Sequence, residues 1–398
     1  MNIKQFALHT QRHIESAAAT TFKRSHVYEL MAAAFGYRTY AALCSEAVFH
    51  RRPKPSAPAA YNLSAVAARC RDLGYATSAD KVASQLLEAL AAERFGVVKI
   101  ADVISKCRST DDGSNWDLSL TQEDAQSDNS AGDSFDDDVD PDTDETSDVL
   151  IESLETAAGR SNADAHYALA LLYRSDADDE ELPEHDGSYW HKQRLAGAQL
   201  SAVAIEWADE FERESDRSTK AGWHLRESAR LGHLNAQLDL VDLYADPMFF
   251  ERELADDDVD DPARVAEIAH RLGRPRDAHR WFTIAAESGD IEAIRTIIET
   301  YDHDDLSKCW TWLYLAKLLG TDLTQSNMRA YHDGGPQDGQ EYDDDFGGPA
   351  YVDGDEGIKL PPLDSGDDVI ARERADEMYR RLHNDADVTP WASRRAGA

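Results

Sequence analysis

Small and aromatic residues recur along this chain at spacings that fit helices. In the stretch "WFTIAAESGDIEA" (281–293), Trp281, Ala285 and Gly289 lie four residues apart and therefore share one helical face. Gly289 is a natural residue to end a helix, because glycine accepts the left-handed backbone conformation. Asp290 follows where the N-cap of a next helix is expected. The stretch predicts a helix, a tight turn and a second helix.

The same pattern occurs several times. Small residues follow Trp190 and Trp312 at similar distances, and "WHLRESARLGHLNA" is a further copy with His224 in the first place. In the partial copy "SNADAHYALALLY", Ser161 and Ala165 lie four residues apart. A helix that follows such a turn often carries a Tyr eight residues after its Ala. The positions that define the repeats are Ala165, Tyr173, Trp190, Ala198, Ala202, Gly232, Ala236, Tyr244, Trp281, Gly289, Ala293, Tyr301, Trp312 and Gly320.

These positions resemble the Sel1-like repeat family, a subclass of tetratricopeptide-like helical hairpins. Its pattern is roughly A-x-x-x-L-G-x-x-Y, a loop, then W-x-x-x-A-A-x-x-G-x-x-x-A, and the resemblance covers about residues 149–324. Two copies depart from it, since Ser161 and Ala198 stand where the turn Gly is expected. The resemblance implies an α-solenoid that serves as a protein-interaction scaffold and has no catalytic residue. We therefore expect an all-α fold whose residues 149–326 form the solenoid, with an acidic insertion at 247–262.

The N-terminal part is expected to form two helical segments, 1–50 and 61–108. In "KRSHVYELMAAAFGYRTYAAL", Ser25 can cap a helix that ends at Gly36, and Thr39 can start the next. Helix, Gly turn and helix are compatible with a DNA-binding helix-turn-helix. Small helical modules that pack on their own apolar side chains are more common, and we favour that interpretation. The stretch is also similar to a short module at the start of various bacterial proteins.

Two segments are too polar to bury a core. Residues 109–148 contain 15 Asp and Glu and no Lys or Arg, which predicts a disordered linker. Residues 327–368 are rich in Gly and Asp and predict a disordered loop. Beyond this loop, apolar side chains at helical spacing predict a helix over 369–384. That helix would cap the exposed end of the solenoid.

Charge is distributed unevenly along the chain. The net charge is −36, yet residues 1–108 hold 15 Lys and Arg against 8 Asp and Glu. The acidic remainder favours a basic protein partner. As an alternative, a basic head could contact nucleic acid through Lys23, Arg24, Arg38, Arg51, Arg52 and Lys54. A third possibility is that the acidic tracts mimic DNA and occupy a nucleic-acid-binding protein.

Motifs that carry chemistry are absent from the sequence. It contains no phosphate-binding glycine loop, nucleophile elbow or H-E-x-x-H zinc pattern. "DDDVDPDTDE" does not fit an EF-hand, because Pro141 stands where the loop needs Gly. His9 and His13 lack a third ligand nearby, and the four Cys form no C-x-x-C pair. We expect no catalytic residue, no metal and no cofactor.

Hydropathy places the chain outside the membrane. It has no apolar run of 18 residues and no apolar segment near its start, so we expect a cytoplasmic protein. The similarity of the N-terminal stretch to a module of bacterial proteins implies a protein of bacterial type. The sequence predicts a non-catalytic scaffold for protein–protein interaction with a basic partner. The alternative is a regulator whose head contacts nucleic acid.

Overall fold

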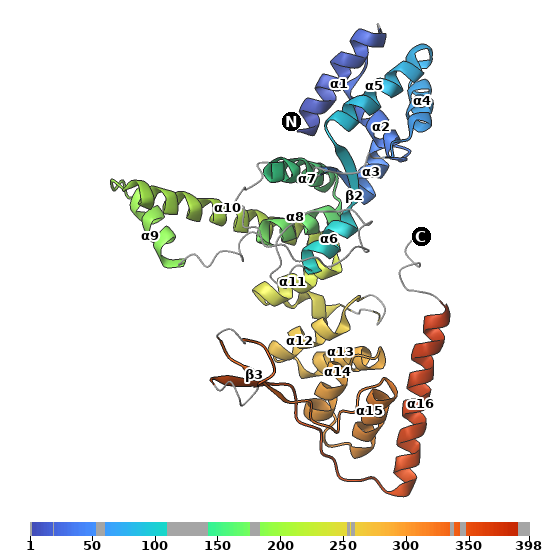
Figure 1. Cartoon of the computed structure of the whole chain (residues 1–398), viewed down its shortest axis with the longest axis vertical. Helices are drawn as coiled ribbons and strands as arrows, with labels where there is room; N and C mark the ends of the chain where they lie inside the picture. The colour runs from blue at the N-terminus through green and yellow to red at the C-terminus, as the bar shows by residue number, and fades with distance from the viewer. Residues whose placement is uncertain are drawn as a thin grey trace. The chain divides into compact units, whose positions relative to one another are not determined.

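The computed structural model describes residues 2–18, 20–52, 60–109, 142–175, 184–252, 255, 259–334, 338–342 and 348–388. Over these ranges the chain is mostly helical, as predicted, with a few short strands (Figure 1). It divides into two compact units, unit 1 (Met1–Leu240) and unit 2 (Val241–Ala398). This boundary does not coincide with the predicted one between head and solenoid.

Unit 1 consists of successive helices and one strand pair. Its elements are α1 (Ile3–Ala18), α2 (Arg24–Ala34), α3 (Tyr40–Glu46), β1 (Ala47–Arg51), α4 (Leu63–Asp72), η1 (Ala76–Ser78), α5 (Ala79–Ala92), β2 (Phe95–Lys99), α6 (Ile100–Ser109), α7 (Asp142–Ala158), α8 (Ala163–Ser175), α9 (Glu184–Leu195), α10 (Ala202–Arg230) and α11 (Leu234–Tyr244), which continues into unit 2. The hydroxyl of Thr39 caps α3 as predicted, 3.0 Å from the Ala42 amide. Ser25 lies inside α2 rather than at its N-cap, so that prediction was wrong.

A strand pair joins the two predicted N-terminal segments. β1 and β2 are antiparallel, with Phe49 opposite Val97, and every residue of β1 is buried. Helix α7 packs on β1. Segments 1–50 and 61–108 are therefore parts of one core rather than separate modules. That core also contains residues of the first predicted repeat, namely Val149, Leu150, Leu154, Ala157, Ala158, Ala165, Ala168 and Leu169.

The two ends of the predicted linker 109–148 are helical. Ser109 ends α6, and α7 already begins at Asp142. Val149, Leu150 and Leu154 give α7 an apolar face, whose burial favours the helix over a disordered chain. The rest of the predicted linker, including the acidic stretch considered as a calcium loop, lies outside the described residues.

Helix α10 is longer than the repeat pattern predicts. The pattern needs a loop between the helix that starts near Ala202 and the next helix, in which His224 takes the first place, but α10 runs unbroken across 29 residues. Helix α9 packs on its first half, where Arg194 bridges two carboxylates of α10. Helix α8 packs on its second half, where the Ser228 hydroxyl donates to the Ala163 carbonyl at 2.8 Å. Helix α8 thus packs on the end of α10 rather than on α9, the next helix along the chain.

Unit 2 is a set of helices with a β-hairpin. Its elements are η2 (Pro247–Glu251), α12 (Pro262–Arg271), α13 (Pro275–Glu287), α14 (Ile291–Thr296), the π-helical turn η3 (Ile297–Tyr301), α15 (Leu306–Leu318), β3 (Arg329–His332), β4 (Ala350–Asp353) and α16 (Ser365–Val388). η2 and the Asp261 cap of α12 fall in the predicted insertion 247–262. α12 packs on α13, and α16 packs along α15. Ala371 and Ala375 of α16 are buried in that contact, and the helix extends past the predicted 369–384 at both ends.

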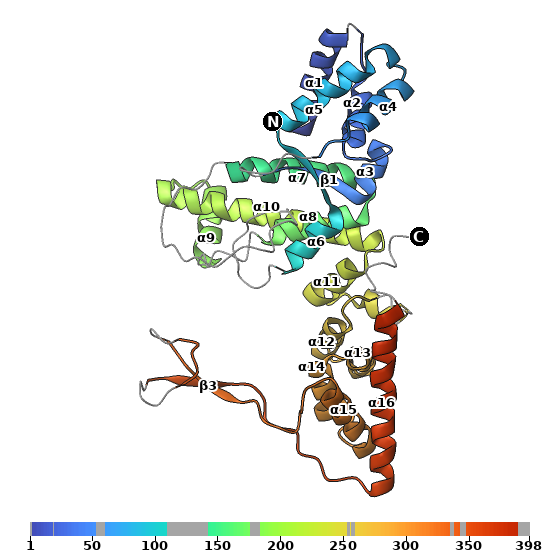
Figure 2. The same cartoon turned by 45° about the vertical axis from the view of Figure 1, so that its right-hand side comes forward.

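The segment 327–368 was predicted to be a disordered loop, and that prediction was wrong for its described part. β3 and β4 pair antiparallel within it, with Tyr331 opposite Tyr351. Figure 2 shows this hairpin standing off the helices of unit 2.

Most of the predicted turns have the same local geometry. Gly232, Gly289 and Gly320 have left-handed φ angles of 100°, 98° and 100°. After Gly289, the Asp290 amide bonds back to the Ala285 carbonyl (3.1 Å), and the Asp290 carboxylate caps the Ala293 amide (2.9 Å) as predicted. In the second copy the left-handed residue is Gly197, with φ of 80°, and not the predicted Ala198.

Candidate functional site

The residues predicted to define repeats lie partly in the core and partly on the surface. Those buried are Ala165, Ala236, Trp281, Ala293 and Trp312. Those half-buried are Tyr173, Trp190, Gly289 and Tyr301. Those exposed are Ala198, Ala202, Gly232, Tyr244 and Gly320. Exposed glycines are expected at turns, but the exposure of Ala198 and Ala202 is a departure, because the repeat pattern needs small residues there for close packing.

The predicted nucleic-acid contacts do not form one free basic face. Lys23, Arg24 and Arg38 are exposed. Arg51 is buried within β1 and forms an ion pair with Glu93 at 2.9 Å, so it is not available to a phosphate group and that part of the prediction was wrong. Arg52 is half-buried, and Lys54 lies outside the described residues.

A polar cluster connects α13, η3 and α15. The Asp302 carboxylate is 7% exposed; it accepts from Trp312 Nε1 at 3.3 Å and lies 3.2 Å from His279 Nε2. The Cys309 thiol donates to the Asp302 carbonyl at 3.0 Å. Burial and nearby carboxylates raise the pKa of Cys309 to about 11, so the thiol is protonated and unreactive at neutral pH. The cluster ties three elements together.

A buried histidine pair connects α8 and α10. The Nδ1 atoms of His166 and His224 are 2.9 Å apart, so one ring donates and the other accepts. Burial, then the neighbouring His166 and Lys220, lower the pKa of His224 to about 4. The pair is therefore neutral at pH 7 and acts as a hydrogen bond between helices.

Metal ligands are not assembled in the part of the chain that the structure describes, where no three His, Cys, Asp or Glu side chains gather around a common point. His9 and His13 are exposed on α1.

The β3–β4 hairpin is an exposed feature of unit 2 (Figure 2); residues 329–353 are called the arm below. β3 is the middle strand of the arm, because it pairs with β4 on one edge and with residues 340–342 on the other. On that other edge, the His332 amide donates to the Gln340 carbonyl (2.9 Å), and the Tyr342 amide donates to the Ala330 carbonyl (2.8 Å). β4 forms the outer edge. Every residue of β4 is exposed, including Tyr351 at 44% and Val352 at 59%.

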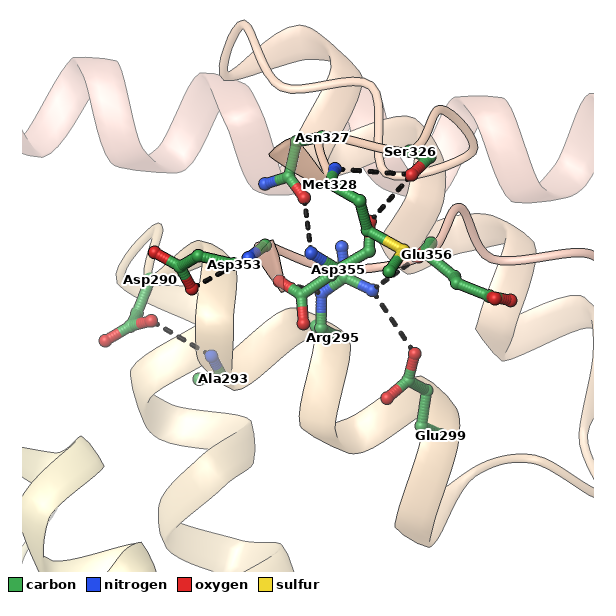
Figure 3. Close-up of polar contacts among 11 residues, drawn as sticks. Asp290, Ala293, Arg295, Glu299, Ser326, Asn327, Met328, Asp353, Asp355 and Glu356 are labelled. Carbon is green, nitrogen blue, oxygen red and sulfur yellow. Dashed lines mark hydrogen bonds and ion pairs between the residues drawn. The ribbon is translucent and has the colours of Figure 1, made fainter. Parts of the chain in front are cut away.

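Arg295 of α14 holds the base of the arm, a neck formed by residues 326–328 and 354–357 (Figure 3). Its side chain is buried; Nη1 donates to the Glu356 carbonyl at 3.1 Å, and Nε lies 3.5 Å from an Asp355 carboxylate oxygen. Nη1 also pairs with Glu299 of η3 at 3.3 Å. Across the neck, the Asn327 side chain accepts from the Asp355 amide. The buried guanidinium thus joins the chain 354–357 to α14 and η3, and Asn327 connects the chain 326–328 to it.

The two chains of the neck approach so closely that glycine is required. A Cβ on Gly357 would lie 2.2 Å from the Thr324 carbonyl oxygen, and a Cβ on Gly354 would lie 2.8 Å from the Asn327 carbonyl oxygen. Directly after this point the Ile358 amide donates to the Leu323 carbonyl at 2.8 Å. The glycines that made the segment look disordered in the sequence therefore permit this close contact.

The arm and its neck are acidic. Residues 329–356 contain nine Asp and Glu and a single Arg, and Arg329 is paired with Glu341 at 2.9 Å. This surface therefore favours a cation or a basic segment as its partner.

Sequence reasoning missed the arm and its Arg295 anchor. The available signal was one Tyr in each of "RAYH" and "AYVD", which lie opposite each other and stack with ring centroids 5.6 Å apart. Four residues are too few for a period-two pattern to stand out from a Gly- and Asp-rich background.

Comparison with known proteins finds no match to a family model, a curated protein or a solved structure. Over the described ranges, no helix combines the length and the apolar character needed to cross a bilayer.

Proposed function

We propose that this protein is a non-catalytic scaffold for protein–protein interaction, built on Sel1-like helical hairpins, and that the arm is a contact element. The anchored arm carries the proposal. A two-stranded hairpin alone is marginally stable in water, yet this one is fixed to α14 by the buried Arg295 and exposes Tyr351 and Val352. An element that is anchored at its base and exposes aromatic and aliphatic side chains is suited to recognition.

The proposed partner is basic. The arm and neck hold nine Asp and Glu, and the whole chain has a net charge of −36. Such a surface accelerates association with basic proteins and disfavours acidic ones and nucleic acid.

Affinity purification from the native host tests this function. The full chain is compared with a variant in which a short Gly-Ser linker replaces residues 329–353, and captured proteins are quantified by mass spectrometry. We expect basic proteins to be captured by the full chain and lost from the variant. Circular dichroism of both proteins controls for folding of the helices. An identical set of captured proteins would refute a role for the arm.

A further inference from the structure

The outer edge of β4 has unused backbone hydrogen-bonding groups. In an antiparallel pair, alternate residues direct their N–H and C=O toward the partner strand. The Asp333 amide donates to the Pro349 carbonyl at 3.0 Å, and Tyr351 is in register two residues further along. Residues 349, 351 and 353 therefore face β3, and Ala350 and Val352 direct their backbone groups to the outside.

The opposite edge of the arm differs. There the outward groups of Ala330 and His332 bond with residues 339–342 of the same chain, including a bond of 3.0 Å from the Gly339 amide to the His332 carbonyl. Among the described residues, nothing pairs with Ala350 or Val352 in a comparable way. The arm thus has one closed edge and one open edge.

Open edge strands usually carry protection against pairing with another chain. Charged side chains, a proline or a bulge within the strand are the common means. In β4 the run Ala350, Tyr351, Val352 has neither charge nor proline, and Pro349 stands before the strand rather than in it. The one charged side chain of the strand is Asp353 at its end, which repels an acidic strand and attracts a basic one. The edge therefore remains competent to receive a further strand of basic sequence.

We propose that β4 binds an extended basic segment of a partner protein as an added strand. This inference rests on the proposed function, in which the arm is the contact element. Tyr351 and Asp353 lie on one face of the strand, and Ala350 and Val352 lie on the other. In the bound segment, Lys or Arg alternates with apolar residues. Its cations then lie beside Asp353 and the Tyr351 ring, and its apolar side chains lie beside Val352.

Charge disfavours a second copy of this chain as the occupant. Pairing of two β4 edges would bring together two arms that each hold an excess of Asp and Glu, including Asp353 in the strand itself. Like charges across adjacent strands are destabilising. A basic segment has the charge opposite to that of the arm, and its cations lie beside Asp353.

A designed peptide tests the proposal on the full chain. The probe is a twelve-residue peptide that repeats Lys-Val-Lys-Thr, and its binding is followed by fluorescence anisotropy. Val352→Pro removes the outward N–H without removing a β3–β4 hydrogen bond, and Val352→Thr is the matched control that keeps this N–H. We expect at least tenfold weaker binding by Val352→Pro and a change of less than threefold for Val352→Thr. Hydrogen exchange at the Ala350 and Val352 amides should slow when the peptide is bound to the wild-type chain.

Three results would overturn the proposal. Equal binding of the peptide to wild type and Val352→Pro would mean that it sits on the acidic surface without strand addition. Absence of binding would exclude a basic strand at this edge. Dimerisation of the wild type that is lost in Val352→Pro would make a second copy the occupant. The proposed function is tested separately from strand addition. If the Val352→Pro variant still captures the host proteins that are lost when residues 329–353 are replaced, the arm remains a contact element although β4 does not add a strand.

Discussion

Ser161 has a left-handed backbone conformation that disfavours any side chain. Its φ is 63°, and it links α7 to α8 in the place where Gly232 and Gly289 stand at other turns. A Cβ in this conformation costs about 1–2 kcal/mol, which glycine avoids. The neighbouring Asn162 supports the turn, because its side chain caps the Ala165 amide at 3.0 Å. The contacts of neighbouring residues therefore stabilise this turn although the backbone conformation is unfavourable for Ser161.

Replacing Ser161 by glycine should stabilise unit 1. We expect Ser161→Gly to raise the free energy of unfolding by about 0.5–1 kcal/mol, because removal of the strain outweighs the greater freedom of glycine in the unfolded chain. Gly289→Ala is the reverse control and should lower it by about 1–2 kcal/mol; crowding adds little there, since the nearest atoms lie 3.8 Å from the added Cβ. Urea denaturation of the full chain measures both. A less stable Ser161→Gly would contradict the account of strain.

His224 should make the stability of unit 1 depend on pH. Its pKa is lowered to about 4 in the folded chain and is about 6.5 when unfolded, so acid protonates the unfolded state first. The contribution of the neutral ring is complete above pH 6.5 and is lost as pH falls toward 4. Relative to His224→Gln, the wild type should lose about 2 kcal/mol between pH 7 and 4.5. Parallel pH profiles of unfolding for the two proteins would argue against this.

At the scale of elements, one turn geometry ends helices throughout the chain. At Gly289 and Gly320, the amide of the residue after the glycine donates to the carbonyl five residues earlier. The same bond occurs at Gly36, Gly74 and Gly273, which are not among the predicted repeat positions. The turn geometry is therefore a general property of this chain. It supports helical hairpins but does not by itself distinguish a Sel1-like repeat from another helical array.

The attachment of the arm to α14 should depend on Arg295. Arg295→Met removes a buried, charged hydrogen-bond donor, and we expect a loss of about 2 kcal/mol in unfolding free energy and faster hydrogen exchange at residues 355–358. Arg329→Met is the control, because Arg329 is exposed and its ion pair with Glu341 should change stability by less than about 0.5 kcal/mol. Equal effects of the two substitutions would show that Arg295 is not the anchor.

At the scale of the whole molecule, the core of unit 1 gathers segments that are far apart along the chain. Phe6 contacts Phe95 with ring centroids 4.6 Å apart, and Phe95 also contacts Phe49 at 6.2 Å. Leu150 and Leu154 of α7 belong to the same core. The N-terminal segments and the first predicted repeat are therefore expected to fold together.

Cleavage within residues 110–141 should leave unit 1 intact. A recognition site for a specific protease, inserted near position 125, allows one cut in the full chain. Because α7 buries apolar side chains against β1, we expect the two fragments to elute together in size-exclusion chromatography and to separate only in denaturant. Separate elution in native buffer would restore the boundary between an independent head and the solenoid.

Much of the local structure follows from the sequence alone. The helical class, the helix ends at Gly36, Gly232, Gly289 and Gly320, and the N-caps at Thr39 and Asp290 are decided by residues within about six positions of each other. Such short-range effects can be recognised in a sequence without knowing what lies nearby in space.

Only the tertiary structure decided the strands, the continuous α10 and the arm. β1 has no alternating pattern because it is buried on both faces, and its partner β2 lies more than forty residues away in the chain. The arm depends on a bond between Arg295 and Glu356, 61 residues apart. The physical reason is the same in both cases. A strand of four or five residues is stable only through hydrogen bonds and burial supplied by distant segments, and these contacts leave no periodic signal in the sequence.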